Sequence, residues 1–139
     1  MPHLTIAYCR RFDFASEVIR FFTGGALWSH CGVVVGDVVV EALTRGVVTT
    51  PINDWKYPAF AFVQVECPDP EAAEQFALDQ VGKKYDWLGC LGAPWRAHWQ
   101  NPNRWYCSEL AEAALVAGGR KRWRDEKMGV SPMESWVVL

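Results

Sequence analysis

The sequence predicts a single α+β domain, with helices packed against an antiparallel sheet. The first half is rich in short β-branched segments, and the second half carries capped helical segments of amphipathic pattern. The chain has 139 residues, of which 50% are hydrophobic, so it can bury a real core. Because no linker or repeat interrupts it, we expect one domain over residues 1–139.

Four stretches of the first half predict strands, and one predicts a helix. The strands are expected at 4–8, within 30–43, at 46–52 and at 59–67. The helix is expected over 13–25, from a cap at Asp13 to a stop at Gly24–Gly25. In the stretch 59–67, alternation places Phe60 and Phe62 on the face opposite Val63 and Val65.

The segment HCGVVVGDVVVEAL (30–43) predicts a β-hairpin. Gly36–Asp37 suits a two-residue turn with glycine first. The runs of valine on both sides are typical of a sheet that is covered on both faces. The turn sets the pairs Val35 with Val38, Val34 with Val39, and Val33 with Val40.

Two helices are predicted in the second half. The first lies within 69–85, where Asp69 is the N-cap, Pro70 occupies the first turn and Gly82 ends it. The second begins at Cys107 and ends at Gly118–Gly119. Residues 86–104 between them form a long irregular segment, and such segments are often functional. The tail GVSPMESWVVL predicts a turn and then a short strand or helical turn.

Composition excludes several classes of protein. The net charge is −2, which gives no footprint for nucleic acid. No stretch approaches the roughly 20 apolar residues that span a bilayer. The N-terminus lacks the features of a secretory signal, so we expect a cytoplasmic chain or one exported by another route. The five cysteines form no CxxC pair and predict reduced thiols rather than a zinc site or a disulfide framework.

Cys107 opens its predicted helix and lies on the apolar face of that helix. Leu110, Ala111 and Ala114 follow at helical spacing, so the cysteine belongs to the stripe that would face the sheet. The unpaired N–H groups and positive dipole end of the first turn would favour a thiolate. The residues alone leave two interpretations open: a small core residue or a nucleophile.

His30 and Glu41 are predicted to be diagonal neighbours on one face of the hairpin. The turn pairs Gly32 with Glu41, and alternation puts His30 on the same face. A diagonal spacing of about 7–8 Å is within reach of a long carboxylate. Glu41 could then orient the imidazole and stabilise its charged form. The alternatives are a hydrogen-bonded structural histidine and a strand-end charge, although a lone carboxylate in a covered strand is costly.

Other polar residues are weaker candidates. His3 is expected at a frayed terminus, and His98 is expected at the surface of the irregular segment. Alternation puts Cys31 on the face opposite the histidine of the hairpin, which argues against it as a nucleophile. Ser108 and Glu109 are expected as first-turn helix residues rather than catalysts.

Four blocks in order, WSHCGVVVGD, VVVEALTRGVVTTPI, GKKYDWLG and WYCSELAEAAL, carry a family resemblance. The chain resembles the circularly permuted branch of the NlpC-type, papain-like cysteine peptidases and amidases, close to the YiiX-like proteins. In that branch a strand with SHvG comes first, then a strand ending EA…GV, a GxpYD stretch after a helix, and YCSEL last. The match covers residues 4–135. Lys84 departs from the pattern, which has proline there.

The resemblance implies a permuted papain-like fold with Cys107 as nucleophile at a helix N-terminus, His30 as general base and Glu41 as orienter. Tyr85 matches a tyrosine that contributes to binding substrate or the oxyanion. The implied reaction is hydrolysis of an amide through a thioester acyl-enzyme, with no metal or cofactor.

Three functions follow from this reading of the site. The first is hydrolysis of a peptide or isopeptide bond in a small peptide or peptidoglycan-like substrate. The second keeps the site but makes it a lipid-directed acyltransferase or thioesterase. The third is a non-catalytic binding module with a vestigial site.

Overall fold

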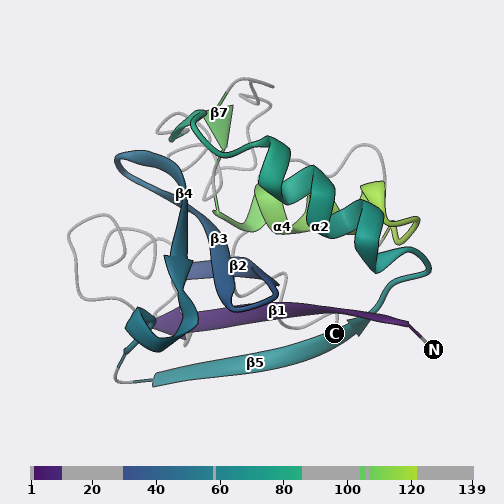
Figure 1. Cartoon of the computed structure of the whole chain (residues 1–139), viewed down its shortest axis with the longest axis horizontal. Helices are drawn as coiled ribbons and strands as arrows, with labels where there is room; N and C mark the ends of the chain where they lie inside the picture. Colours follow the sequence, from purple (N-terminus) through teal and green to yellow (C-terminus); the bar gives the residue numbers. More distant parts are fainter. Residues whose placement is uncertain (1, 11–29, 58, 86–103, 106, 122–139) are drawn as a thin grey trace, which may run out of the picture.

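Strands from the first half of the chain assemble into a five-stranded antiparallel sheet (Figure 1). The structure is a computed structural model, and it describes residues 2–10, 30–57, 59–85, 104–105 and 107–121. The strands are β1 (His3–Arg10), β2 (His30–Val35), β3 (Val38–Leu43), β4 (Gly46–Pro51) and β5 (Ala59–Glu66). They lie in the order β4-β3-β2-β1-β5. The strands predicted at 4–8, 46–52 and 59–67 are therefore confirmed, each to within about two residues of its ends.

The central hairpin has the predicted register. The three expected valine pairs join β2 to β3, and Gly36 in the turn has a φ of 59°. Gly32 is also required for close packing. A Cβ at Gly32 would lie 2.6 Å from Val39 Cγ1 and 3.2 Å from Glu41 Cβ, so only glycine lets β3 approach here. This close approach of the two strands brings Glu41 of β3 near His30, the first residue of β2.

The sheet buries its two faces in different ways. One face carries the main core, which includes Leu4, Ile6, Cys31 and Val33 and packs against the helices. The other face holds a smaller cluster around Trp55. As alternation predicts, Val63 and Val65 point to the main core, whereas Phe60 and Phe62 lie on the opposite face and are 52% and 43% exposed.

Two helices cover the main-core face side by side (Figure 1). Helix α2 (Pro70–Asp79) begins at Asp69, whose side chain accepts a hydrogen bond from the N–H of Ala72 at 3.0 Å. Helix α4 (Cys107–Ala117) ends at Gly118–Gly119, as predicted. The α+β class is confirmed. Among the described residues, neither helix α2 nor helix α4 is long and apolar enough to cross a membrane.

Three details differ from the sequence prediction. Helix α2 stops before Gly82, because Gln80 and Val81 already form a turn before the positive φ of that glycine. The last two residues of 69–85 then form β6 (Lys84–Tyr85), which pairs in parallel with β7 (Arg104–Trp105). His3 is not frayed but pairs with Glu66 in the sheet, since β1 and β5 run together over their full length.

Some predictions fall on other parts of the chain. The helix at 13–25, His98, Cys90, the tail and residues 86–103 of the irregular segment predicted at 86–104 lie outside the described residues.

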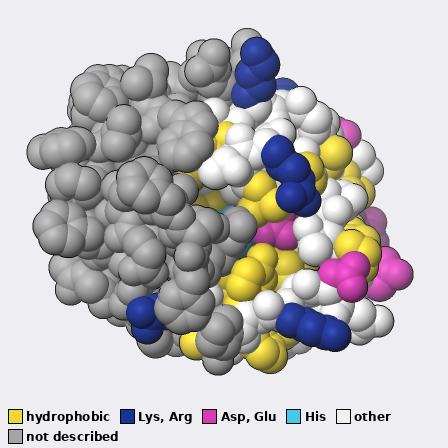
Figure 2. Space-filling model, turned by 90° about the vertical axis from the view of Figure 1, so that its left-hand side faces the viewer, with side chains coloured by type: hydrophobic (Ala, Val, Ile, Leu, Met, Phe, Trp, Pro, Cys, Tyr) yellow, Lys and Arg dark blue, Asp and Glu magenta, His cyan; other side chains and the backbone are white. Residues whose placement is uncertain are grey.

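The described surface mixes charges of both signs. Figure 2 shows Lys and Arg side chains separated by apolar and acidic ones on the face that it presents. The described part of this face therefore has no large patch of charged side chains of a single sign.

Candidate active site

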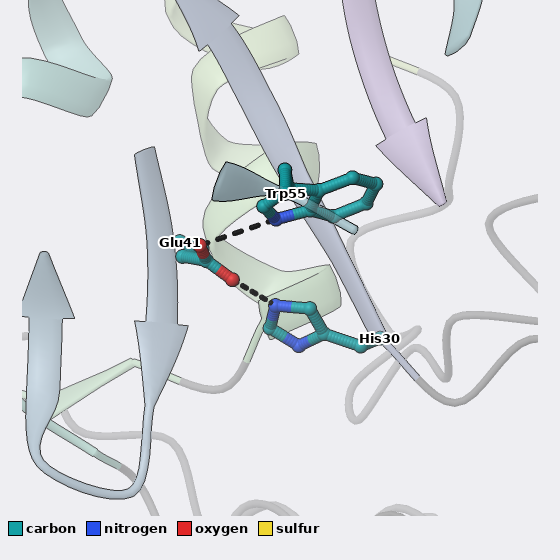
Figure 3. A network of polar contacts seen from close by, with 3 residues as sticks. All are labelled: His30, Glu41 and Trp55. Carbon is teal, nitrogen blue, oxygen red and sulfur yellow. Dashed lines mark hydrogen bonds and ion pairs between the residues drawn. The ribbon is translucent and has the colours of Figure 1, made fainter. Parts of the chain in front are cut away.

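His30 and Glu41 form a buried ion pair at the end of the central hairpin. His30 Nε2 donates to Glu41 Oε1 at 2.6 Å, and both side chains are almost inaccessible to solvent. This contact confirms the prediction that His30 and Glu41 are diagonal neighbours on one face of the hairpin. Because Nε2 is bound to the carboxylate, the other ring nitrogen, Nδ1, faces away from Glu41 (Figure 3). Nδ1 is therefore the nitrogen left for another partner.

The carboxylate of Glu41 is surrounded by donors. Trp55 Nε1 donates to Glu41 Oε2 at 3.2 Å, and Thr50 of the neighbouring strand β4 also contributes to lowering the pKa of the carboxyl group. Burial by itself would raise the pKa of Glu41, but interactions with His30, Thr50 and Trp55 together lower it. Glu41 is thus held as a carboxylate inside the protein.

Cys107 begins α4 and is 2% exposed. Burial opposes its charged form, yet the thiol of Cys31 and then the imidazole of His30 hold the pKa of Cys107 well below its usual range. Burial likewise opposes the charge on His30, but interactions with Cys107 and Glu41 raise the pKa of His30 to about 9. Cys107 and His30 are thus close enough to stabilise each other as thiolate and imidazolium.

Cys31 has a place in this cluster that the sequence argument missed. It does lie on the face of β2 opposite Glu41, as alternation predicts, but α4 packs on that face. The pKa of Cys31 is raised well above its usual value, chiefly by hydrogen bonding to Cys107 and secondly by burial. Cys31 therefore stays a neutral thiol beside the Cys107 thiolate. No disulfide joins any of the four cysteines that the structure describes.

Tyr85 is 7% exposed and belongs to the same buried cluster as Cys107. The segment that carries it is fixed to the sheet, because Val47 N–H donates to Lys83 O at 2.8 Å and Gly82 N–H donates to Val47 O at 2.9 Å. Ser108 and Glu109 are first-turn residues of α4, as expected, and both are buried.

Trp55 and Thr50 are the other site residues that sequence reasoning overlooked. The pairing of Glu41 with Val48 makes Thr50 a diagonal neighbour of Glu41 on the same face. The register argument used for β2 and β3 would have found Thr50 if it had been extended to β4. Trp55 follows the 3₁₀ turn η1 (Ile52–Asp54), and no sequence signal says that this turn folds back over the sheet.

The described residues thus define a small α+β protein in which a cysteine, a histidine and a glutamate meet where the sheet joins a helix N-terminus. Neither a protein-family model nor a curated protein matches the sequence.

A solved structure with a similar fold is that of YiiX from Escherichia coli O157:H7, described as a metalloprotein and as DUF1105. The match has a TM-score of 0.66 and 21% sequence identity, and it covers 88% of this chain and 69% of YiiX. The chain therefore has a YiiX-like fold.

Proposed function

We propose that the protein is a cysteine hydrolase that cleaves an amide bond by acyl transfer. In this proposal Cys107 is the nucleophile, His30 is the general base and acid, and Glu41 orients the imidazole. The observation that carries it is geometric: β2 begins at His30, which Glu41 holds at 2.6 Å, and it packs against α4, which begins at Cys107. The raised pKa of His30 and the lowered pKa of Cys107 agree with this arrangement. A nucleophile, a base and an orienting carboxylate are the parts that acyl transfer needs.

The fold supports the same proposal. A nucleophile at a helix N-terminus, packed against an antiparallel sheet that carries the histidine, is what the circularly permuted NlpC-type, papain-like arrangement requires. Helix α4 begins at Cys107, and β2 begins at His30. We infer that the YiiX-like fold is used here in that way.

The reaction begins with a charged pair. With a raised pKa on His30 and a lowered pKa on Cys107, the thiolate and imidazolium coexist at neutral pH. The thiolate attacks the carbonyl carbon, a C–S bond forms and the carbonyl π electrons move to oxygen. Backbone N–H groups in the first turn of α4 are proposed to stabilise that oxyanion, with assistance from Tyr85.

The second half of the reaction restores the enzyme. The C–N bond breaks while the imidazolium gives its Nδ1 proton to the leaving nitrogen. Water then attacks the thioester and His30 accepts its proton, which releases the acid and regenerates thiolate and imidazolium. A peptide or isopeptide amide is the proposed substrate class.

A metal centre does not fit the described residues. YiiX is described as a metalloprotein, but within the described ranges of this chain no three His, Cys, Asp or Glu side chains gather as a metal site. No step of the proposed reaction is therefore assigned to a metal.

Alkylation of the individual cysteines tests the proposal. Purified protein is treated with iodoacetamide between pH 5 and 9, and each cysteine is followed by mass spectrometry. Cys107 should label fastest and keep its reactivity at pH 6, because its pKa is lowered. Cys67 serves as the internal reference, since burial raises its pKa.

Two matched variants complete this test. His30→Gln should slow labelling of Cys107 at pH 6, and Cys67→Ala should leave it unchanged.

Wild-type protein and Cys107→Ser are then compared on a library of peptide and isopeptide amides, where only the wild type should release amine. If Cys107 labels no faster than Cys67 near neutral pH, the proposal fails. Release of fatty acid from lipid esters without amide cleavage would replace it with the lipid-directed alternative.

A further inference from the structure

The second oxygen of Glu41 is occupied by a residue outside the cysteine, histidine and glutamate set. Trp55 Nε1 donates to Oε2 at 3.2 Å, whereas His30 Nε2 holds Oε1 at 2.6 Å. Figure 3 shows Glu41 between the two rings, with one oxygen directed to each. A carboxylate with one partner can turn about its terminal bond, because that torsion is broad. With a donor on each oxygen, the plane of the carboxylate is fixed.

Trp55 is itself held firmly from several sides. Its side chain is 2% exposed and clusters with Ala7 and Cys9 of β1 and Val39 of β3, on the sheet face that also carries Glu41. The ring of Tyr57 lies edge-to-face with the indole at 5.0 Å between centroids, and the ring of Phe62 is tilted against it at 5.7 Å. The indole N–H is therefore presented to Glu41 from a buried, packed position.

The backbone that carries Trp55 is tied to the same hairpin as His30 and Glu41. Ile52 N–H donates to Asp37 O in the β2–β3 turn at 2.9 Å, and Trp55 N–H donates to Ile52 O at 3.2 Å. The indole also faces the imidazole of His30, at 6.4 Å between centroids and 36° between planes. One rigid unit therefore contains the carboxylate, its orienting donor and the imidazole.

We propose that Trp55 is a positioning residue for the reaction: its indole N–H fixes the Glu41 carboxylate, which in turn fixes the His30 ring with Nδ1 turned to Cys107. This inference rests on the proposed function. Trp55 touches neither the substrate nor the reacting atoms, and it acts through Glu41. The groups that face Glu41 are His30 from β2, Thr50 from β4 and Trp55 from the segment after η1.

The first test compares Trp55→Phe with Phe62→Leu. Trp55→Phe keeps an aromatic ring but loses the N–H, whereas Phe62→Leu removes a packing partner of Trp55 and keeps the N–H. The rate of Cys107 labelling at pH 6 should fall roughly tenfold in Trp55→Phe. This is the size expected when one hydrogen bond to a charged group is lost. Because the Trp55 N–H lowers the pKa of Glu41, the acid limb of the pH profile should also move to higher pH. Phe62→Leu keeps the N–H, so its labelling should fall much less than that of Trp55→Phe and its acid limb should stay in place.

A second measurement separates positioning from general stability. The indole N–H resonance of Trp55, assigned by its absence in Trp55→Phe, should shift strongly in Glu41→Gln and much less in Phe62→Leu, where only the ring current of Phe62 is lost. If Trp55→Phe does not fold, a benzothienyl analogue of tryptophan at position 55 keeps the ring shape with sulfur in place of N–H, and the same loss is expected.

The outcomes distinguish the two proposals. If Cys107 is reactive in the wild type and equally reactive, with the same pH profile, in Trp55→Phe or the analogue, the inference about Trp55 is wrong and the proposed function stands. If Cys107 is unreactive in the wild type, the proposed function fails, and the role of Trp55 fails with it.

Discussion

Cys31 lies beside Cys107 on the face of β2 that packs against α4, and it is fully buried. Its thiol is the leading cause of the lowered pKa of Cys107, and its own pKa is raised in return. A neutral thiol next to a thiolate can donate a hydrogen bond to it and so favours the charged form. The charge on the proposed nucleophile is therefore set by both Cys31 and His30.

Removal of the Cys31 donor should raise the pKa of Cys107. We expect Cys31→Ala to shift the ultraviolet titration of the Cys107 thiolate to higher pH and to slow its alkylation at pH 6. Cys31→Ser retains a donor and should restore most of the wild-type behaviour. Cys67→Ala is the control for loss of a buried thiol elsewhere. A titration curve that is the same in all four proteins would remove Cys31 from this role.

The His30–Glu41 pair should also make stability depend on pH. The folded-state pKa of His30 is about 9, above the ordinary value of about 6.5, so its stabilising contribution is complete below about pH 6.5 and is lost as the pH rises through 9. The pKa of Glu41 is lowered, so its contribution is present above about pH 4.3 and is lost as the pH falls through the folded-state value. The pair therefore contributes most between these limits.

We accordingly expect Glu41→Gln to lower the free energy of unfolding by about 3–5 kcal/mol near pH 5.5, because it removes one partner of a buried ion pair. The loss should become smaller towards pH 10, where His30 is neutral. Urea unfolding of both proteins at the two pH values measures this. Glu71→Gln, at an exposed position in the first turn of α2, should cost less than about 1 kcal/mol at either pH. An equal loss for Glu41→Gln at both pH values would contradict the assignment.

At the scale of elements, the contact between the end of α4 and the start of α2 sets the direction of the helix that carries Cys107. Asp69 N–H donates to Gly118 O at 2.9 Å, and a Cβ on Gly118 would collide with Cys67 Sγ and lie 2.7 Å from Asp69 O. The glycine is therefore needed for close approach of the two helices.

Gly118→Ala should destabilise the protein by about 2–3 kcal/mol through overpacking. Gly36→Ala is the contrasting variant, because it meets no atom within 4 Å and costs only the strain of a φ of 59°, about 1 kcal/mol. Thermal unfolding of both proteins measures the difference. Gly118 lies at the opposite end of α4 from Cys107, so the folded fraction of Gly118→Ala should keep its rate of Cys107 alkylation. A smaller loss in Gly118→Ala than in Gly36→Ala would argue against a tight contact.

At the scale of the whole molecule, local patterns predicted most of the described elements. Alternation and turn chemistry placed the strands, and caps and glycines placed both helices. The same local rules extended to the contact between His30 and Glu41, because a two-residue turn fixes the register of a hairpin over its whole length. Helix α2 ended early, since a glycine with positive φ marks the end of the turn that follows a helix and not the last helical residue.

What the sequence by itself determined is therefore most of the described elements, the hairpin register and the buried pair of His30 and Glu41, all of which depend on interactions between near neighbours in the chain. Only the tertiary structure decided that α4 packs on β2, so that Cys107 meets both His30 and Cys31, and that Trp55 folds back onto Glu41. These contacts join residues far apart in the chain. They depend on how helices and loops cross the sheet, and no periodicity or turn rule encodes that crossing.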